Sequence, residues 1–264
     1  NAYVKPVEYC HLRKVSLKSI GLIIVAAIFL FIMADYVNAC SMIAFQNLLD
    51  DSLQAIVNKP VEALVVVAIL PAIIEEFLFR GMIYRGIANK SNKKIVIIIS
   101  ALLFAFLHMN FNQMCYAFVM GLVFAIVIYL TDNLSVSILL HMLFNAFTVI
   151  ITCFEKSNAI QAILQCNIAG YTLFNPSLTD TQGKIEISLL IIGGLIAILS
   201  AVIAGWLILL IAKTEKTTET TINNENILKD NDNIFKNNEN WKPDFRFFAG
   251  SGVCILIAIL YEIL

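Results

Sequence analysis

The stretch that decides the fold of this chain is "LPAIIEEFLFRG", residues 70–81, where two adjacent glutamates and an arginine interrupt a long apolar run. Burying a charged side chain at the centre of a bilayer costs about 2.5–3.5 kcal/mol even on insertion scales, so such groups face a bundle interior or a water-filled cavity. Glu75, Glu76 and Arg80 therefore predict a polar site inside a bundle of membrane helices.

The composition of the whole chain agrees with a membrane location. Of its 264 residues, 59% are hydrophobic and 14% are charged, whereas a soluble domain carries about 25% charged residues. We therefore expect one integral membrane domain over residues 1–264, with the lipid bilayer as a partner and no nucleic acid partner. The six cysteines show no CxxC pairing, and a cysteine in an apolar run usually behaves as a small hydrophobe.

The lengths of the apolar runs predict the number of membrane spans. A bilayer core about 30 Å thick needs about 20 helical residues to cross it. We expect an all-α, polytopic bundle of about seven transmembrane helices, near residues 16–38, 61–86, 94–109, 113–131, 133–153, 185–212 and 247–264. The motif "HMNFNQ" (108–113) predicts a tight turn or a break between the third and fourth runs.

Two long connections differ in composition. Residues 154–184 mix glycine, asparagine and proline with scattered apolar side chains, which favours an ordered surface loop. Residues 214–246 consist mainly of Asn, Thr, Glu and Lys and bury too little apolar surface to offset the entropy of ordering. They predict a disordered cytoplasmic loop.

The distribution of Lys and Arg predicts the orientation, because cytoplasmic segments carry the excess. An inside N-terminus puts fifteen of these residues on the cytoplasmic side and three outside, namely Lys59, Lys156 and Lys184. We therefore expect a multi-pass protein of the cell membrane with a cytoplasmic N-terminus.

The spacing of the motif in the second run separates its two glutamates. Residues four apart share a helix face, so Glu76 can pair with Arg80, while Glu75 is turned about 100° away and can do chemistry. A helix-packing network or a proton relay is the alternative reading of these three residues.

Polar side chains also interrupt the third and fifth runs. His108 ends "FAFLH", and His141 and Asn145 lie four apart in "HMLFN". Taken singly, each could serve only to tie two helices by a hydrogen bond worth about 0.6 kcal/mol. Together with the glutamates they can converge in one bundle interior, forming a catalytic core over about residues 61–153.

Such a set of groups can hydrolyse a peptide bond. A carboxylate and a neutral imidazole can hold one water and remove its proton. A second histidine and an asparagine can donate hydrogen bonds to the oxyanion that forms when this water attacks a carbonyl. At about 1.5 Å per residue from the cytoplasmic ends, Glu76 and His141 lie about 14 Å deep but His108 about 21 Å, so a tilt or break in the third run must bring His108 back.

Three motifs in this order resemble those of a known family. "EEFLFR", "FAFLH" and "HMLFN" are similar to the EExxxR, FxxxH and HxxxN motifs of the CAAX protease and bacteriocin-processing (CPBP, or Abi) family of intramembrane endopeptidases, related to type II CAAX prenyl endopeptidases. The resemblance covers about residues 61–150, and the flanking runs match only in being hydrophobic.

The resemblance implies a role for each motif residue. Glu75 would be the catalytic carboxylate, with His108 as its partner in activating water. His141 and Asn145 would form the oxyanion hole. Supporting roles fall to Glu76, Arg80 and Phe104, the last shaping the cavity.

The resemblance favours a mechanism without a cofactor, with zinc as the alternative. Glu75, His108 and His141 could supply three ligands to a catalytic ion with an open fourth position. Against zinc, the HExxH arrangement is absent from the sequence, and Asn145 has a better use as an oxyanion donor.

The sequence also bears on the substrate class and on two alternative functions that are not enzymatic. The bias toward Asn, Lys and Ile is typical of a low-GC bacterium, where prenylated substrates are not expected. The resemblance then implies a peptide or membrane-anchored protein substrate, in maturation of, or self-immunity to, a secreted peptide. A transporter would usually show internal repeats, and none is found between the halves. A catalytically silent immunity or scaffold protein would carry the same residues.

Overall fold

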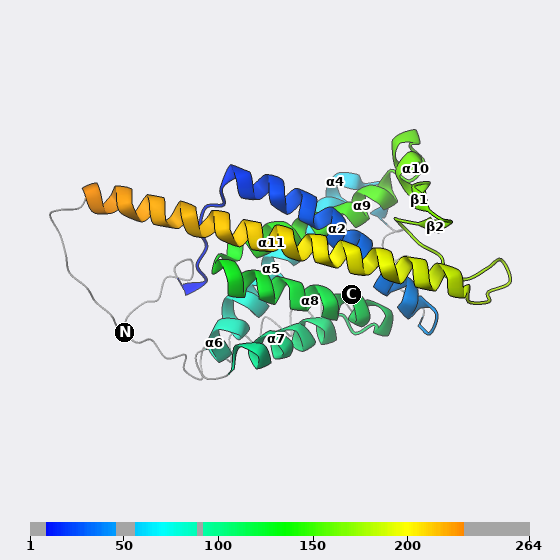
Figure 1. Cartoon of the computed structure of the whole chain (residues 1–264), viewed down its shortest axis with the longest axis horizontal. Coiled ribbons are helices and arrows are strands. Elements are labelled where there is room, and N and C mark those ends of the chain that lie inside the picture. The colour runs from blue at the N-terminus through cyan, green and yellow to red at the C-terminus, as the bar shows by residue number, and fades with distance from the viewer. Residues whose placement is uncertain (1–8, 46–55, 89–91, 230–264) are drawn as a thin grey trace.

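The computed structural model describes residues 9–45, 56–88 and 92–229. It is a helical bundle built on α2 (Leu17–Met42), which begins where the Ser16 side chain accepts a hydrogen bond from the Ser19 backbone N–H at 3.1 Å. α2 packs against α8 (Phe111–Thr131), α9 (Leu134–Cys153) and α11 (Ile187–Lys229). In Figure 1, α2 and the long α11 run side by side along the bundle.

The segment that carries the paired glutamates is one continuous helical stretch whose geometry changes along its length. It comprises α4 (Pro60–Ala63), the π-helix η1 (Leu64–Ile69), α5 (Leu70–Glu76), the π-helix η2 (Phe77–Tyr84) and α6 (Arg85–Ala88). Pro71 has no backbone N–H to donate, so the regular hydrogen-bond ladder cannot pass through it. Glu75 and Glu76 end α5, between the two wide π segments.

Asparagine caps fix the turns around the other motif helices. α7 (Lys93–Leu107) begins at Asn92, α8 at Asn110 and α9 at Asn133, and each side chain accepts a backbone N–H two residues on. α7 ends at Leu107 and α8 begins at Phe111, so the predicted turn after residue 107 is confirmed.

Within the described part of the chain, four helices are long and apolar enough to cross a membrane: α2, α8, α9 and Ile187–Thr218 of α11. The protein is therefore a helical membrane protein. Of the remaining predicted runs, 61–86 is the stretch divided by its π segments, 94–109 corresponds to the 15-residue α7, and 247–264 lies outside the described residues.

The connection at 154–184 is ordered, as predicted. It contains α10 (Asn158–Leu164) and a short antiparallel hairpin of β1 (Asn167–Ile168) and β2 (Tyr171–Thr172), a small exception to the all-α expectation. Its Tyr171 is buried against α11 at Gly193, because a Cβ on Gly193 would clash with the Tyr171 ring.

Two expectations need correction. Residues 214–229 were expected to lack structure, but they continue α11 as a helix. Glu215 anchors this extension, because its buried carboxylate accepts from the Ser16 backbone N–H at 3.2 Å and from Asn133 Nδ2 at 3.1 Å. Residues 230–246 lie outside the described part of the chain. Arg80, counted among the cytoplasmic charges, is fully buried between helices instead.

Candidate active site

Glu76 and Arg80 form a fully buried ion pair at the centre of the motif helices. Arg80 Nη1 donates to Glu76 Oε1 at 2.7 Å, and both side chains are 0% exposed. The pairing predicted from their spacing is confirmed. Arg80 Nη2 donates to the backbone carbonyl of Gly121 at 3.0 Å. Gly121 also allows α8 to lie close to α7, since a Cβ at this position would lie 3.0 Å from the Cα of Ala101.

Aromatic rings enclose the Arg80 guanidinium. Its central carbon lies 4.4 Å from the Phe104 ring centroid and 5.2 Å from that of Phe124. Ring faces attract a cation most where water is excluded. Phe104 also makes edge contacts with the rings of His108 and His141, at 5.2 and 5.7 Å. It therefore joins the arginine to both histidines.

The Glu76 carboxylate also holds two groups of α9. Ser137 Oγ donates to Glu76 Oε2 at 2.7 Å, and His141 Nδ1 lies 3.1 Å from Glu76 Oε1. A carboxylate paired with arginine only accepts, so His141 carries its proton on Nδ1. Glu76 thereby fixes the orientation of the His141 ring and leaves Nε2 to face elsewhere.

His141 Nε2 faces the second glutamate. It lies 3.9 Å from Glu75 Oε2, and the Glu75 side chain is 13% exposed. The two adjacent carboxylates thus approach opposite nitrogens of one imidazole. The spacing of the motif separated the glutamates, but their meeting on His141 was not predicted.

His108 lies at the turn that ends α7. Its Nδ1 is 3.0 Å from the backbone carbonyl of Phe104, which can only accept. Nδ1 therefore carries the proton, and Nε2 of the neutral ring is a hydrogen-bond acceptor. An imidazole held in this way can orient a water or take its proton.

His108, His141 and Asn145 line one small cavity. It offers about 20 Å³ to the centre of a water molecule, and about 10–15 Å³ is enough to hold one. The other lining residues are mostly aromatic or apolar: Phe104, Tyr116, Ala117, Met120, Phe124 and Phe144. Asn145 Nδ2 donates to the Val67 carbonyl in η1 at 3.3 Å.

The cavity differs from the expected one in two respects. Glu75 is not among its lining residues and approaches it through His141. Its wall is mainly aromatic rather than polar. The convergence of both histidines and Asn145 agrees with the prediction, and the break after α7 brings His108 to them.

Sequence reasoning missed two residues of this site, Ser137 and Phe124. Ser137 is four residues before His141 and shares its helix face, a signal that was available. Phe124 stacks on His141 with ring centroids 4.7 Å apart and also faces Arg80. It belongs to no motif and could not have been chosen among the other phenylalanines.

In residues 9–45, 56–88 and 92–229, no group of three or more His, Cys, Asp or Glu is placed to hold a metal ion. The alternative zinc ligands Glu75, His108 and His141 do not form such a group within these residues.

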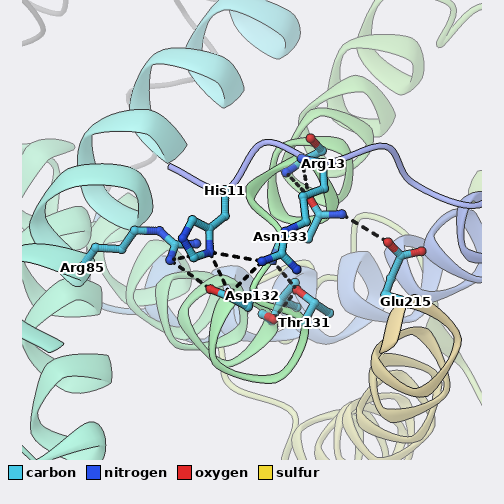
Figure 2. Close-up of polar contacts among 9 residues, drawn as sticks. His11, Arg13, Arg85, Thr131, Asp132, Asn133 and Glu215 are labelled. Carbon is cyan, nitrogen blue, oxygen red and sulfur yellow. Dashed lines mark hydrogen bonds and ion pairs between the residues drawn. The ribbon is translucent and has the colours of Figure 1, made fainter. Parts of the chain in front are cut away.

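A second polar cluster ties the end of the glutamate helix to the rest of the bundle (Figure 2). Asp132, in the turn between α8 and α9, accepts from His11 at 2.7 Å, Arg13 at 3.2 Å and Arg85 at 2.9 Å. Burial raises the pKa of the Asp132 carboxyl, but Arg85 and His11 outweigh burial and hold this pKa below its usual range. Next to it, Asn133 reaches Glu215 of α11.

One protein family matches the segment that carries these residues. Residues 57–147 match the family model described as type II CAAX prenyl endopeptidase Rce1-like. These residues contain every motif residue described above. Residues 57–147 are therefore similar to the CAAX protease family.

A curated member of the CAAX protease family is similar over part of its length. The membrane-embedded CAAX protease MroQ of Staphylococcus aureus (strain USA300) is 34% identical over 116 residues, which make up 42% of this chain and 47% of that protein. The chain thus matches about half the length of this relative. No solved structure matches the chain.

Proposed function

We propose that this protein is an intramembrane endopeptidase that hydrolyses a peptide bond with a water held between its histidines. The observation that carries the proposal is the cavity of about 20 Å³ lined by His108, His141 and Asn145, inside the segment that matches the CAAX protease family. The cavity is close to the size of one water.

Water activation falls to His108 and Glu75. His108 Nε2 accepts a hydrogen bond from the water and orients it, because Nδ1 is committed to the Phe104 carbonyl. The water oxygen bonds to the carbonyl carbon of the substrate, and Glu75 takes up the proton. Glu75 then returns this proton to the leaving amine as the carbon–nitrogen bond breaks.

His141 and Asn145 stabilise the oxyanion. Asn145 Nδ2 has two hydrogens and donates one to the Val67 carbonyl, so the second can be donated to the oxyanion. His141, whose Nε2 lies 3.9 Å from Glu75, donates from Nε2 in its doubly protonated form. Its positive charge balances the oxyanion once Glu75 has taken up the water proton. One such donor is worth about 10²–10³ in turnover.

The proposal also covers the cofactor, the membrane topology and the substrate. We infer a reaction that uses no metal, seven membrane spans and a cytoplasmic N-terminus. The substrate is a secreted peptide or a membrane-anchored protein, and its processing serves maturation or self-immunity. The excess of Lys and Arg in the predicted inside segments supports the orientation.

The proposal is tested with purified protein in detergent and a peptide library, with products read by mass spectrometry in ¹⁸O-water. The parent is compared with Glu75→Gln, His108→Gln and the matched control Glu62→Gln, which makes the same change at an exposed position of the same helical stretch. We expect cleavage with one ¹⁸O in the new carboxylate, lost in the first two variants and retained in the control.

The outcomes separate the competing functions. Peptide binding without cleavage by the parent would indicate a silent immunity or scaffold protein, and uptake of an intact solute into vesicles a transporter. Loss of cleavage on chelation, with recovery on adding Zn²⁺, would replace the metal-free mechanism by a zinc-dependent one.

A further inference from the structure

A second and much larger hollow lies between α2 and α11, away from the candidate active site. It offers about 540 Å³, within the range of about 300–1,000 Å³ that is typical of small-molecule sites. Leu22 and Leu210 form its apolar part, while Lys18, Lys213, Thr214, Thr217 and Thr218 supply its polar part. We call this hollow the α2–α11 groove.

The groove lies where the apolar spans end. Lys18 is in the first turn of α2, and Lys213 is near the end of the apolar part of α11. Apolar residues of the groove therefore lie toward the bilayer core and its lysines toward the headgroups. Lysines next to a span attract anionic lipids, by about fivefold in affinity each.

Two carboxylates at this end of the bundle, Glu215 and Asp132, are committed elsewhere. Glu215 is buried and accepts from Ser16 and Asn133, and Asp132 accepts from His11, Arg13 and Arg85 (Figure 2). Among the described residues, no ion pair involves Lys18 or Lys213. Both lysines are exposed and their charges are available to a ligand.

The threonines of the groove provide hydrogen-bond acceptors for a ligand. Thr214 Oγ1 donates to the Leu210 carbonyl and Thr218 Oγ1 to the Thr214 carbonyl, both at 2.9 Å. With their hydrogens committed, these oxygens can only accept hydrogen bonds. The groove thus combines cations for an acidic group with acceptors for hydroxyl donors.

We propose that the α2–α11 groove binds a phospholipid with a phosphoglycerol headgroup. The phosphate lies between Lys18 and Lys213, the glycerol hydroxyls donate to the threonine oxygens, and an acyl chain runs along Leu22 and Leu210. The bound lipid would join α2 to α11 at the end of the bundle where Glu215 also links them. This site is independent of the proposed protease activity.

The test measures lipid retained by the full chain after purification from mixed vesicles of phosphatidylglycerol and phosphatidylcholine. Native mass spectrometry compares the parent with Lys18→Gln/Lys213→Gln. The matched control is Lys93→Gln/Lys94→Gln, which removes the same charge from exposed positions at the start of α7. We expect preferential retention of phosphatidylglycerol by the parent and the control, and about a 30-fold loss in the groove variant.

Thr214→Val/Thr218→Val tests the headgroup. It should lower retention of phosphatidylglycerol relative to phosphatidic acid, which has the phosphate without the glycerol. Equal losses in the groove and control variants would reduce the effect to general surface charge and overturn the proposal, as would equal retention of both lipids by the parent. A disulfide between Leu22→Cys and the native Cys254 would show that residues 247–264 of this chain fill the groove, and would also overturn it.

Discussion

Replacing Glu76 with glutamine isolates the contribution of the buried ion pair to stability. Glutamine keeps the shape of the side chain but removes the charge that faces Arg80 Nη1 at 2.7 Å, and neither side chain is exposed to solvent. Removing one partner of a buried pair costs about 3–5 kcal/mol because the other charge stays buried. The rings of Phe104 and Phe124 and the Gly121 carbonyl still contact the guanidinium, so we expect the lower end, about 3 kcal/mol.

The assay is thermal unfolding in detergent, followed by the reaction of buried Cys10 with a thiol dye in protein whose other cysteines are replaced by serine. A loss of about 3 kcal/mol corresponds to a melting temperature about 6–12 °C below the parent. The melting temperature of Glu75→Gln should decrease less, since the Glu75 carboxylate lies 3.9 Å from an imidazole rather than against an arginine. Glu62→Gln, which is exposed, should stay within about 2 °C.

A double variant separates the pair from the other contacts of Glu76. Glu76→Gln/Arg80→Met removes both charges, and replacing a buried pair by apolar groups is often neutral or stabilising. It should melt above Glu76→Gln alone. A single variant that melts within 2 °C of the parent, or a double variant that melts below the single one, would refute the reasoning.

Three further outcomes can be measured. Gly121→Val should lower the free energy of unfolding by about 1–3 kcal/mol, because the added side chain overpacks against the α7 backbone. Gly205→Ala should leave the free energy of unfolding unchanged, because a Cβ there meets nothing within 4 Å. The melting temperatures of the two variants measure the difference. Because the pKa of Asp132 is lower in the folded protein, its carboxylate stabilises the fold above the unfolded pKa of about 4, and this stabilisation is lost as pH falls through the folded pKa. In Asp132→Asn, the free energy of unfolding should therefore decrease less steeply as the pH is lowered. Cysteines placed in 214–246 should resist an impermeant thiol reagent in intact cells while the native, exposed Cys166 reacts, and the reverse pattern would invert the topology.

The local pattern of the sequence determined the membrane helices and the pairing within one helix. Runs of apolar residues specify spans because the bilayer requires them, and a four-residue spacing places Glu76 and Arg80 on one helix face. The turn after His108 was also readable, since an asparagine-rich hexapeptide interrupts the apolar pattern. These features depend only on residues that are close along the chain, so they can be predicted from the sequence before the fold is known.

Only the tertiary structure decided which side chains meet across helices. The contacts of Ser137 and His141 with Glu76, and the stacking of Phe124 on His141, depend on the rotation and separation of helices packed together. Neither quantity is encoded in the spacing of residues along one helix. α11 likewise continues through residues 214–229, where composition predicted no structure. Glu215, at the start of this extension, bonds to Ser16 and Asn133, which are distant in sequence and adjacent only in the folded bundle.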